Sequence, residues 1–411
     1  MLWEFLVPPS QMGQAARTVV EARDYQLTFA DGTKAIDLTS GLWNVNFGYG
    51  NPFVAERIEK VLRDGHYATL FRASHPAAHE VAERLLAHLD MSEAALVFST
   101  SGSALNDVMV KLALQWNSLL GRHARTVVSI QGSYHGMTLN SMKLSGENLG
   151  QAVYGAHSAN FVHLPLDDVE AWKQFFQTRG NTVALVVLEP VLGSGAIPLS
   201  NDVLNVIFEA RKQYGFLIGA DEVAMGLYRL GTIAASFDWK ESADLLGFSK
   251  GLTNGTAASS VLVVSNTVAE VFIQQDSVFM HGETQAGSPV ACAAILGVLD
   301  FLDSANIQEQ YHQLESRVSL DLEHLARKYH LSRRGMGLFQ YLGWGDADSF
   351  ESDALSGSLG ADYFRSRGIS IQPSLEGIQI IPAITMPISI WDEAVRNLHA
   401  AFEELTTRGT K

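Results

Sequence analysis

The segment STSGSALND (99–107) could bind a phosphate, because it follows an apolar, strand-like run and precedes a helical pattern. Ser101, Gly102 and Ser103 would place backbone N–H groups and hydroxyls at the start of that helix, where an anion is favoured. A Ser-rich helix cap without a ligand would have the same sequence. On this segment alone both interpretations stay open.

A second segment, GSYHGMT (132–138), could bind a planar ligand. Its two glycines suggest a backbone bent so as to present Tyr134 and His135. The tyrosine ring could stack on the ligand and the histidine could position it. Alternatively, the pair belongs to a loop whose side chains find their partners within the protein.

An acid and a lysine end two further apolar runs. Asp221 ends FLIGAD, and a buried carboxylate there needs a cation, either in a surface salt bridge or as the protonated ring nitrogen of a cofactor. Lys250 follows LLGFS and could be simply solvated, or it could act as nucleophile and base beside a cofactor. Pyridoxal phosphate requires a phosphate-binding segment, an aromatic residue that stacks on its ring, an acid and a lysine. The four segments together provide these groups.

The surrounding elements would bring these four segments to one edge of a sheet. Between the apolar runs, apolar residues recur every three or four positions, which predicts helices. Strands that are apolar on both faces, each followed by a helix, indicate an α/β fold with a large, mostly parallel sheet, whose ligands bind at the carboxyl ends of the strands. The predicted strands are ALVFS (95–99), TVVSI (126–130), VALVVLE (183–189), FLIGADE (216–222), LLGFS (245–249) and SVLVV (260–264).

The pattern changes after Pro289, which predicts a second, smaller α+β domain. Long helices over 289–303 and 307–330, short strands and a final helix near 391–406 follow. Near the N-terminus, YQLTFADGTKAIDLTSG reads as a hairpin with its turn at ADGT. The expected divisions are residues 1–46, joining the small domain; 47–291, the large cofactor-binding domain; and 292–411, the small domain.

Composition excludes several kinds of partner. The net charge of −15 argues against nucleic acid, because phosphate binding needs clustered Lys and Arg. The single cysteine, Cys292, excludes an internal disulfide and a cysteine-based zinc site, and we expect no bound metal. No apolar run reaches the roughly 18 residues of a spanning helix, and the start MLWEFLVPPS is unlike a signal peptide. We therefore expect no membrane contact and a cytoplasmic location.

Over nearly its whole length the sequence resembles the class III (omega) aminotransferases, which are fold-type I pyridoxal-phosphate enzymes. The resemblance implies a large, mostly parallel sheet domain, a smaller α+β domain, and a homodimer with shared active sites. It is carried, in order, by DLTSGLWNVNFGYGNP, STSGSALND, YHG, EPVLGSGAIP, GADEVAMGLYRLG, SKGLTNG, HGETQAGSPVACAA and RGMGLFQYLG.

The resemblance also implies a role for individual residues. Lys250 would form a Schiff base with the cofactor and move a proton between substrate and cofactor. Asp221 would keep the pyridine nitrogen protonated. Val223 and Tyr134 would enclose the ring, with His135 beside it. The other implied positions are Ser101, Gly102 and Ser103 at the phosphate, Thr284 reaching the phosphate from a second subunit, Glu189 near the phenolic side of the ring, and Trp43 at the substrate entrance.

The sequence departs from the family where relatives bind a substrate carboxylate. Met137, Gln372 and Gln379 stand at positions where relatives often carry arginine. An arginine–carboxylate pair cannot be mimicked by Met or Gln, which predicts a pocket without the usual α-carboxylate site. Arg72 or Arg229 could substitute for the missing arginines. The expected substrate-binding residues are Trp43, Met137, Arg72 and Gln372.

These inferences favour an aminotransferase. It would move an amino group from an amine or amino-acid donor to an aldehyde or ketone, which could be a biosynthetic intermediate. Two alternatives stay open: an aminomutase or racemase of the same fold, which returns the amine to the same molecule, and a non-catalytic homologue that binds the cofactor and serves as a partner protein.

Overall fold

The protein, described here by a computed structural model, divides into two compact units. The described residues are 2–64, 67–344, 357–374 and 376–408. The large unit comprises Phe53–Tyr228 and Thr232–Ala305, and the described parts of Met1–Pro52, Arg229–Gly231 and Asn306–Lys411 form the small unit. The chain therefore passes between units after Pro52 and after Ala305, and Arg229–Gly231 joins the small unit from within the large one. The divisions expected from the sequence are 46/47 and 291/292.

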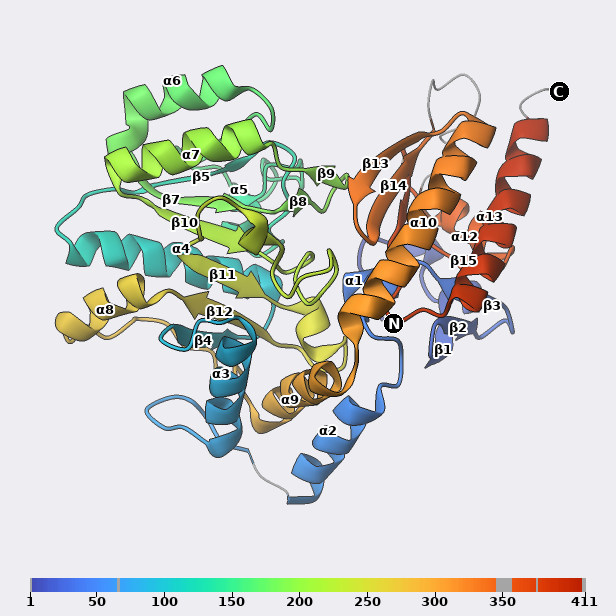
Figure 1. The fold of residues 1–411 in the computed structure, drawn as a ribbon, viewed down its shortest axis with the longest axis horizontal. Coiled ribbons are helices and arrows are strands. Elements are labelled where there is room, and N and C mark those ends of the chain that lie inside the picture. The colour runs from blue at the N-terminus through green and yellow to red at the C-terminus, as the bar shows by residue number, and fades with distance from the viewer. Residues whose placement is uncertain (1, 65–66, 345–356, 375, 409–411) are drawn as a thin grey trace. The chain divides into compact units, whose positions relative to one another are not determined.

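A seven-stranded sheet forms the centre of the large unit (Figure 1). Its strand order is β4-β12-β11-β10-β7-β5-β6, and β11, β10, β7, β5 and β6 run parallel while β12 is antiparallel to both of its neighbours. The strands are β4 (Ala95–Ser99), β5 (Thr126–Ile130), β6 (Phe161–Leu164), β7 (Val183–Leu188), β10 (Leu217–Asp221), β11 (Leu245–Phe248) and β12 (Ser260–Val264).

Helices accompany this sheet, as the alternating apolar pattern predicts. Helix α9 belongs to the large unit because it packs against α3 and against the 3-10 helix η5 (Lys250–Thr253). This packing places the second division of the chain later than expected. The helices are α2 (Pro52–Asp64), α3 (Pro76–His88), α4 (Gly102–Leu119), α5 (Leu139–Leu144), α6 (Val169–Arg179), α7 (Asn201–Tyr214), α8 (Asn266–Gln274) and α9 (Pro289–Ser304).

Helix α4 is anchored to the sheet by one apolar face. Leu105, Met109 and Leu112 recur at helical spacing on this face, and all three are buried in a core cluster together with Leu185 and Leu217 from the strands. Burying an apolar side chain of this size contributes about 1.5–3 kcal/mol, so the face fixes the helix firmly. The N-terminus of α4 is thereby held beside the carboxyl end of β10.

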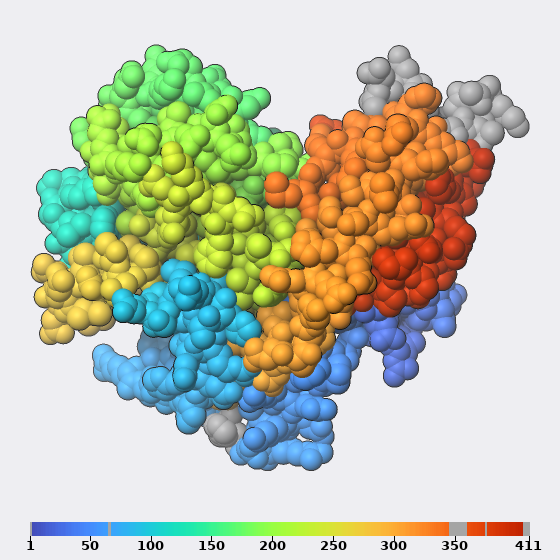
Figure 2. Space-filling model, viewed as in Figure 1, coloured from blue at the N-terminus to red at the C-terminus, as the bar shows by residue number. Residues whose placement is uncertain are grey.

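The small unit contains two sheets and long helices. One sheet has the order β1-β2-β3-β15, with the predicted hairpin as β2 and β3, and the other has the order β13-β14-β16. Figure 2 shows α10 and α13, orange and red, side by side on its surface. The elements are β1 (Val19–Arg23), β2 (Gln26–Phe29), β3 (Lys34–Asp37), α1 (Ser40–Trp43), α10 (Ile307–Tyr329), β13 (Ser332–Met336), β14 (Phe339–Gly343), α12 (Gly357–Arg365), β15 (Ile369–Ser370), β16 (Gly377–Ile380) and α13 (Ile388–Arg408).

Among the described residues, no single helix is both long and apolar enough to cross a membrane. Helices α9 and α10 meet those criteria only as a pair, and the pair is bent by 82°.

Candidate active site

The acid and the lysine predicted from the sequence lie at the ends of two neighbouring parallel strands. Asp221 ends β10 and pairs in register with Gly247 of β11. Lys250 follows β11 and begins η5. Its φ of 47° is left-handed, a conformation that costs free energy for a residue with a side chain. Such strain is concentrated at functional sites, where the surrounding structure maintains it.

The Asp221 carboxylate is buried, and both of its oxygens accept hydrogen bonds. One oxygen, Oδ2, accepts from Nδ1 of His135 at 2.8 Å and from Nδ2 of Asn106 at 2.8 Å. The other, Oδ1, accepts from the backbone N–H of Val223 at 3.1 Å. The side chain of Asn106 also donates to the carbonyl oxygen of His135 at 2.8 Å. Asn106 was not identified from the sequence, yet it ties α4, the Tyr-His loop and β10 together.

These contacts keep Asp221 anionic. Burial alone would raise the pKa of Asp221, but the hydrogen bonds from His135 and Asn106 outweigh burial and lower it below its ordinary value. For His135, burial acts to lower the pKa, and the bond and charge of Asp221 overcome this and raise it. Asp221 is therefore the negatively charged member of this pair, and the raised pKa of His135 favours the protonated, positively charged form of the histidine.

Two glycines allow the three predicted cofactor segments to touch. A Cβ on Gly102 would lie 3.0 Å from the side chain of Val223, and one on Gly136 would lie 2.2 Å from Oγ of Ser103. Gly136 also has a φ of 121°, which side-chain-bearing residues rarely adopt. The helix start contacts both the Tyr-His loop and Val223, two residues after Asp221, as a site assembled from all three segments requires.

The helix start itself is arranged for an anion. Ser101 is the N-cap of α4, and its side chain accepts from the N–H of Ala104 at 3.2 Å. The first turn contains no acidic residue, so the positive end of an 18-residue helix is not neutralised by its own side chains. Ser103 accepts from the N–H of Met137 at 3.2 Å, which places Met137 beside this helix start.

A second buried carboxylate holds the Tyr-His loop. Glu189 accepts from the backbone N–H groups of Tyr134 and Gly193, each at 3.0 Å. Burial raises the pKa of Glu189 to about 7. Burial, followed by the charge of Glu147, also raises the pKa of the half-buried Tyr134 hydroxyl. The tyrosine is therefore neutral, and its position is set through its backbone rather than through its ring.

This arrangement fits pyridoxal phosphate. A phosphate matches the helix N-terminus at Ser101–Ser103, and a protonated ring nitrogen matches the anionic Asp221. Nε2 of His135 and Oδ1 of Asn106 are buried without a hydrogen-bond partner among the described residues. Buried polar atoms of this kind are costly when unpaired, so their presence is consistent with a bound polar group.

Glu222 directly follows β10 and stabilises the fold of the next loop. Its hydrogen-bond partners differ from those of Asp221. Its carboxylate accepts from the N–H groups of Ala235 at 3.1 Å and Ser236 at 2.6 Å, closing the loop that follows β10. Burial raises the pKa of Glu222 to about 7 from an ordinary value of 4.5.

The raised pKa of Glu222 predicts a pH-dependent effect of Glu222→Gln. The stability that this carboxyl contributes is fully present below its unfolded pKa and is lost as pH rises through about 7. Neutral glutamine does not ionise, so relative to wild type the variant should gain about 1–3 kcal/mol of unfolding free energy between pH 5 and pH 8. Denaturant unfolding across this range measures it. Glu209→Gln, on the exposed face of α7, is the control and should show no such trend. If the unfolding free energies of Glu222→Gln and wild type changed in parallel with pH, the raised pKa assigned to Glu222 would be wrong.

The predicted substrate residues fall in both units. In the large unit, Met137 is 44% exposed, and Arg72 is exposed with a left-handed φ of 56°. Thr284, also exposed, accepts a hydrogen bond from the Tyr67 hydroxyl through its backbone oxygen. Trp43 and Gln372 lie in the small unit, half-buried and exposed respectively.

Arg229 is committed to the packing of the small unit. Its side chain is fully buried, and its terminal nitrogens donate to the carbonyl oxygen of Pro382 at 2.6 Å and to Oδ1 of Asn46 at 2.7 Å. An arginine that is fully buried in this way is not exposed to a substrate carboxylate. Of the two proposed substitutes for the missing arginines, only Arg72 is accessible.

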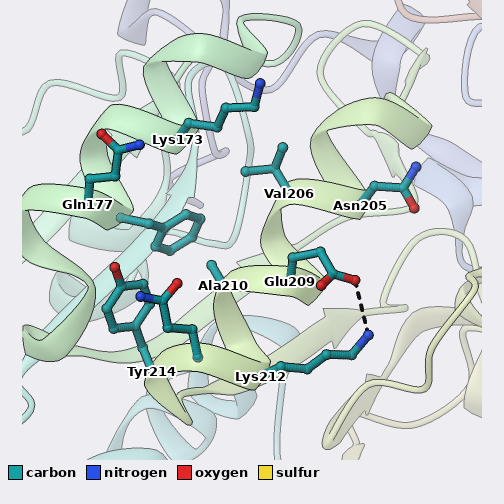
Figure 3. Close-up of a pocket in the computed structure, with 10 residues that line it drawn as sticks. Lys173, Gln177, Asn205, Val206, Glu209, Ala210, Lys212 and Tyr214 are labelled. Carbon is teal, nitrogen blue, oxygen red and sulfur yellow. Dashed lines mark hydrogen bonds and ion pairs between the residues drawn. The ribbon is translucent and has the colours of Figure 1, made fainter.

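A separate surface groove of about 630 Å³ lies between α6 and α7 (Figure 3). Its charged residues include Glu209 and Lys212, which pair with each other at 3.1 Å. All of its lining residues come from these two helices, and none comes from a strand end. It is therefore distinct from the candidate site.

Comparison with known proteins shows a matching family model, similar sequences and a similar fold. The sequence model of the family described as "Aminotransferase class-III" matches residues 9–402. The chain is 27% identical to gamma aminobutyrate transaminase 2 of Solanum lycopersicum, covering 92% of this chain and 91% of the relative. It is 26% identical to vanillin aminotransferase of Capsicum frutescens, covering 92% and 89%. Its fold matches a PLP-bound amine transaminase from an uncultivated Pseudomonas species with a TM-score of 0.88, at 24% identity, over 98% of each chain.

Proposed function

This chain belongs to the class III aminotransferases, which use pyridoxal 5'-phosphate, and we propose that its substrates lack the usual α-carboxylate. The donor is an amine, and the acceptor is an aldehyde or ketone. The observation that carries this proposal is Met137. Its backbone N–H contacts Ser103 at the helix start, and its partly exposed side chain is apolar where relatives often carry arginine. The burial of Arg229 removes one candidate replacement.

Each residue at the strand ends has a separate task in this proposal. When bound, pyridoxal phosphate supplies an electron-accepting ring that makes the proton on the substrate Cα easier to remove. Asp221 holds a proton at the ring nitrogen, because its carboxylate is kept anionic by His135 and Asn106. The N-terminus of α4 orients the phosphate. Val223 and Tyr134 would contact the ring.

Lys250 is the proton carrier. Its Nζ would take the proton from the substrate Cα and hold it, and the reverse transfer would complete the second half of the cycle. The left-handed backbone of Lys250 fixes where its side chain starts, two residues past the end of β11. Precise placement of a base is a large part of its catalytic effect.

The substrate pocket distinguishes between substrates because it lacks the polar groups that would pair with a substrate carboxylate. A substrate carboxylate entering beside Met137 would lose water without gaining a bidentate partner, which disfavours amino-acid donors. A neutral or apolar substituent incurs no such cost. Among the relatives described above, vanillin aminotransferase is named for an aldehyde without a carboxylate. This similarity supports the proposed substrate class.

The test is whether the amino group moves between two molecules. The purified enzyme is given an amine donor labelled with ¹⁵N and an unlabelled aldehyde, and products are identified by mass spectrometry. We expect the aldehyde to become a ¹⁵N-labelled amine while the donor yields a separate carbonyl compound. An aminomutase or racemase would instead return the label to the donor skeleton, and that result would refute the proposal.

A homodimer is part of the proposal. The loop around Tyr67 and Phe71 packs against the segment before Thr284, since a Cβ on Gly282 would lie 2.5 Å from the Phe71 ring. Val278 and Met280, on the same segment, are 73% and 74% exposed. Apolar side chains gathered in this way are typical of a subunit interface. Sedimentation should give the mass of two chains, and a monomer at micromolar concentration would contradict this part.

A further inference from the structure

The residue that joins β4 to α4 is held by a carboxylate from a distant part of the chain. Ser99 ends β4 and Ser101 is the N-cap of α4, so Thr100 alone connects the strand to the helix start. The backbone N–H of Thr100 donates to Oε2 of Glu283 at 3.2 Å, and its hydroxyl donates to the same oxygen. The hydroxyl of Ser99 donates to Oε1. One side chain therefore accepts three hydrogen bonds from the two residues that lead into the helix.

A histidine and a lysine hold Glu283 from the other side. Nε2 of His281 lies 3.3 Å from Oε1 of Glu283, and its Nδ1 lies 3.2 Å from Nζ of Lys111 on α4. A lysine ammonium can only donate, so Nδ1 accepts, and the hydrogen of the ring is on Nε2, which donates to Glu283. Lys111 also donates to the carbonyl oxygen of Met280 at 2.8 Å. The direction of each bond from α4 through the histidine to the glutamate is therefore defined.

The carboxylate form of Glu283 is the one that these donors require. Burial acts to raise the pKa of Glu283, but the hydrogen bonds from Ser99, Thr100 and His281 outweigh burial and lower it below its ordinary value. Each oxygen accepts from one hydroxyl, which can rotate, and from one N–H group, whose direction is set by its own surroundings. Both oxygens must therefore be acceptors, as they are in a carboxylate and are not in an amide.

We propose that Glu283 is a positioning residue for the cofactor phosphate, because it holds Thr100 and thereby directs the free N–H groups at the start of α4. This inference rests on the proposed function, in which that helix start binds the phosphate. A helix N-terminus favours an anion through the N–H groups that point at it, so their direction matters. The charge of Glu283 by itself would repel a phosphate. Its contribution to phosphate binding must therefore come from geometry.

Glu283→Gln removes this geometry while it changes little else. The amide NH₂ must face either the N–H of Thr100 or Nε2 of His281, because each oxygen of the native carboxylate accepts from one of them. His281 could accept at Nε2 only by moving its hydrogen to Nδ1, where it would point at the ammonium of Lys111. In either orientation of the amide, at least one donor loses its acceptor.

The test measures how much the phosphate contributes to binding of the cofactor. Full-length enzyme freed of cofactor is titrated with pyridoxal phosphate and with pyridoxal, which lacks the phosphate, and both dissociation constants are read from the absorbance of the bound compound. Glu270→Gln is the matched control. Glu270 is exposed on α8, where it accepts from the side chain of Asn266 at 3.1 Å.

Wild-type enzyme should bind pyridoxal phosphate more tightly than pyridoxal. In Glu283→Gln we expect this preference to fall at least about tenfold while the affinity for pyridoxal stays the same, and Glu270→Gln should match wild type. A general loss of stability would weaken both compounds equally, and loss of the negative charge alone would strengthen binding of the phosphate compound. An unchanged or increased preference in Glu283→Gln therefore refutes the inference.

A second variant decides the question if Glu283→Gln does not fold. Thr100→Val removes one hydroxyl donor and keeps the backbone N–H, so it should lower the preference in the same direction by a smaller factor. An unchanged preference in this variant would count against the role of Glu283. Wild-type enzyme that shows no preference at all would instead overturn the phosphate site of the proposed function, on which this inference rests.

Discussion

Replacing Lys250 with alanine should reduce transamination by at least about 10⁴-fold, because it removes the amine to which the proposed mechanism assigns the proton transfer. The variant should still bind pyridoxal phosphate, since the cap of α4 and the hydrogen bonds from His135 and Asn106 to Asp221 are made by other residues. The variant should therefore contain nearly as much cofactor as wild type. Its turnover should nevertheless fall close to the background rate of free cofactor in solution.

Single-turnover mixing with an amine donor measures this loss, and cofactor content is measured after release in alkali. Lys212→Ala is a suitable control, because this lysine is exposed on α7 and pairs only with carboxylates of the large unit's surface. It should react at the wild-type rate. A Lys250→Ala enzyme that keeps cofactor-dependent turnover would show that another base performs the transfer, and the proposed mechanism would be wrong.

Asp221→Asn should cost about 10²- to 10³-fold in the rate of the same step. Asparagine is neutral, so it cannot hold a proton at the ring nitrogen. The positive charge favoured on His135 would also lose its partner, since Nδ1 of the histidine donates to this carboxylate at 2.8 Å. The pKa of His135, which the charge of Asp221 helps to raise, should therefore fall in the variant. Nuclear magnetic resonance of the imidazole measures that change independently of activity.

Asp244→Asn is the matched control for Asp221→Asn. Asp244 precedes β11, at the opposite end of the same strand pair, where it accepts from the N–H of Ile218 at 2.8 Å and pairs with Arg211 at 3.4 Å. Its replacement should lower stability and leave the chemical step intact. If both variants lost activity equally, the effect would come from the β10–β11 pair as a structural unit and not from the charge at its carboxyl end.

The fold could be predicted largely from apolar patterning. Strands β7, β10 and β11 are buried along their whole length, so each appears in the sequence as an uninterrupted apolar run. Strand β6 was missed because it lies at the edge of the sheet and is only half-buried, with His163 in the middle of FVHL. The second boundary between units was placed too early because nothing local in α9 reveals that it packs on α3.

The residues that hold the acid and the lysine in place were harder to predict from the sequence. The sequence placed Asp221 and Lys250 at strand ends, and the structure has them there. Asn106 was missed, although its spacing of four from Gly102 puts both on one face of the helix, because the sequence alone does not say which face meets the strand. Arg229 was offered as a substrate ligand, yet its complete burial depends on contacts with residues far away in the sequence.

The left-handed turn at Ser40–Trp43 could not have been foreseen. Glycine at position 41 permits one such residue, but Ser, Leu and Trp all disfavour the conformation. The turn depends on four donors converging on Asp37, and that convergence exists only once β3 and the chain around Tyr49 have come together. Local preference is overridden here by tertiary hydrogen bonds.

The central claim is that this aminotransferase acts on substrates without an α-carboxylate. Isopropylamine and alanine test it most directly, because they differ only in a methyl group replaced by a carboxylate. Each is mixed in excess with the yellow holoenzyme, and the rate at which the yellow absorbance disappears is recorded. We expect isopropylamine to react at least about tenfold faster than alanine, the discrimination that one unpaired carboxylate imposes. A faster reaction with alanine would mean that the site binds an α-carboxylate after all, and would contradict this account.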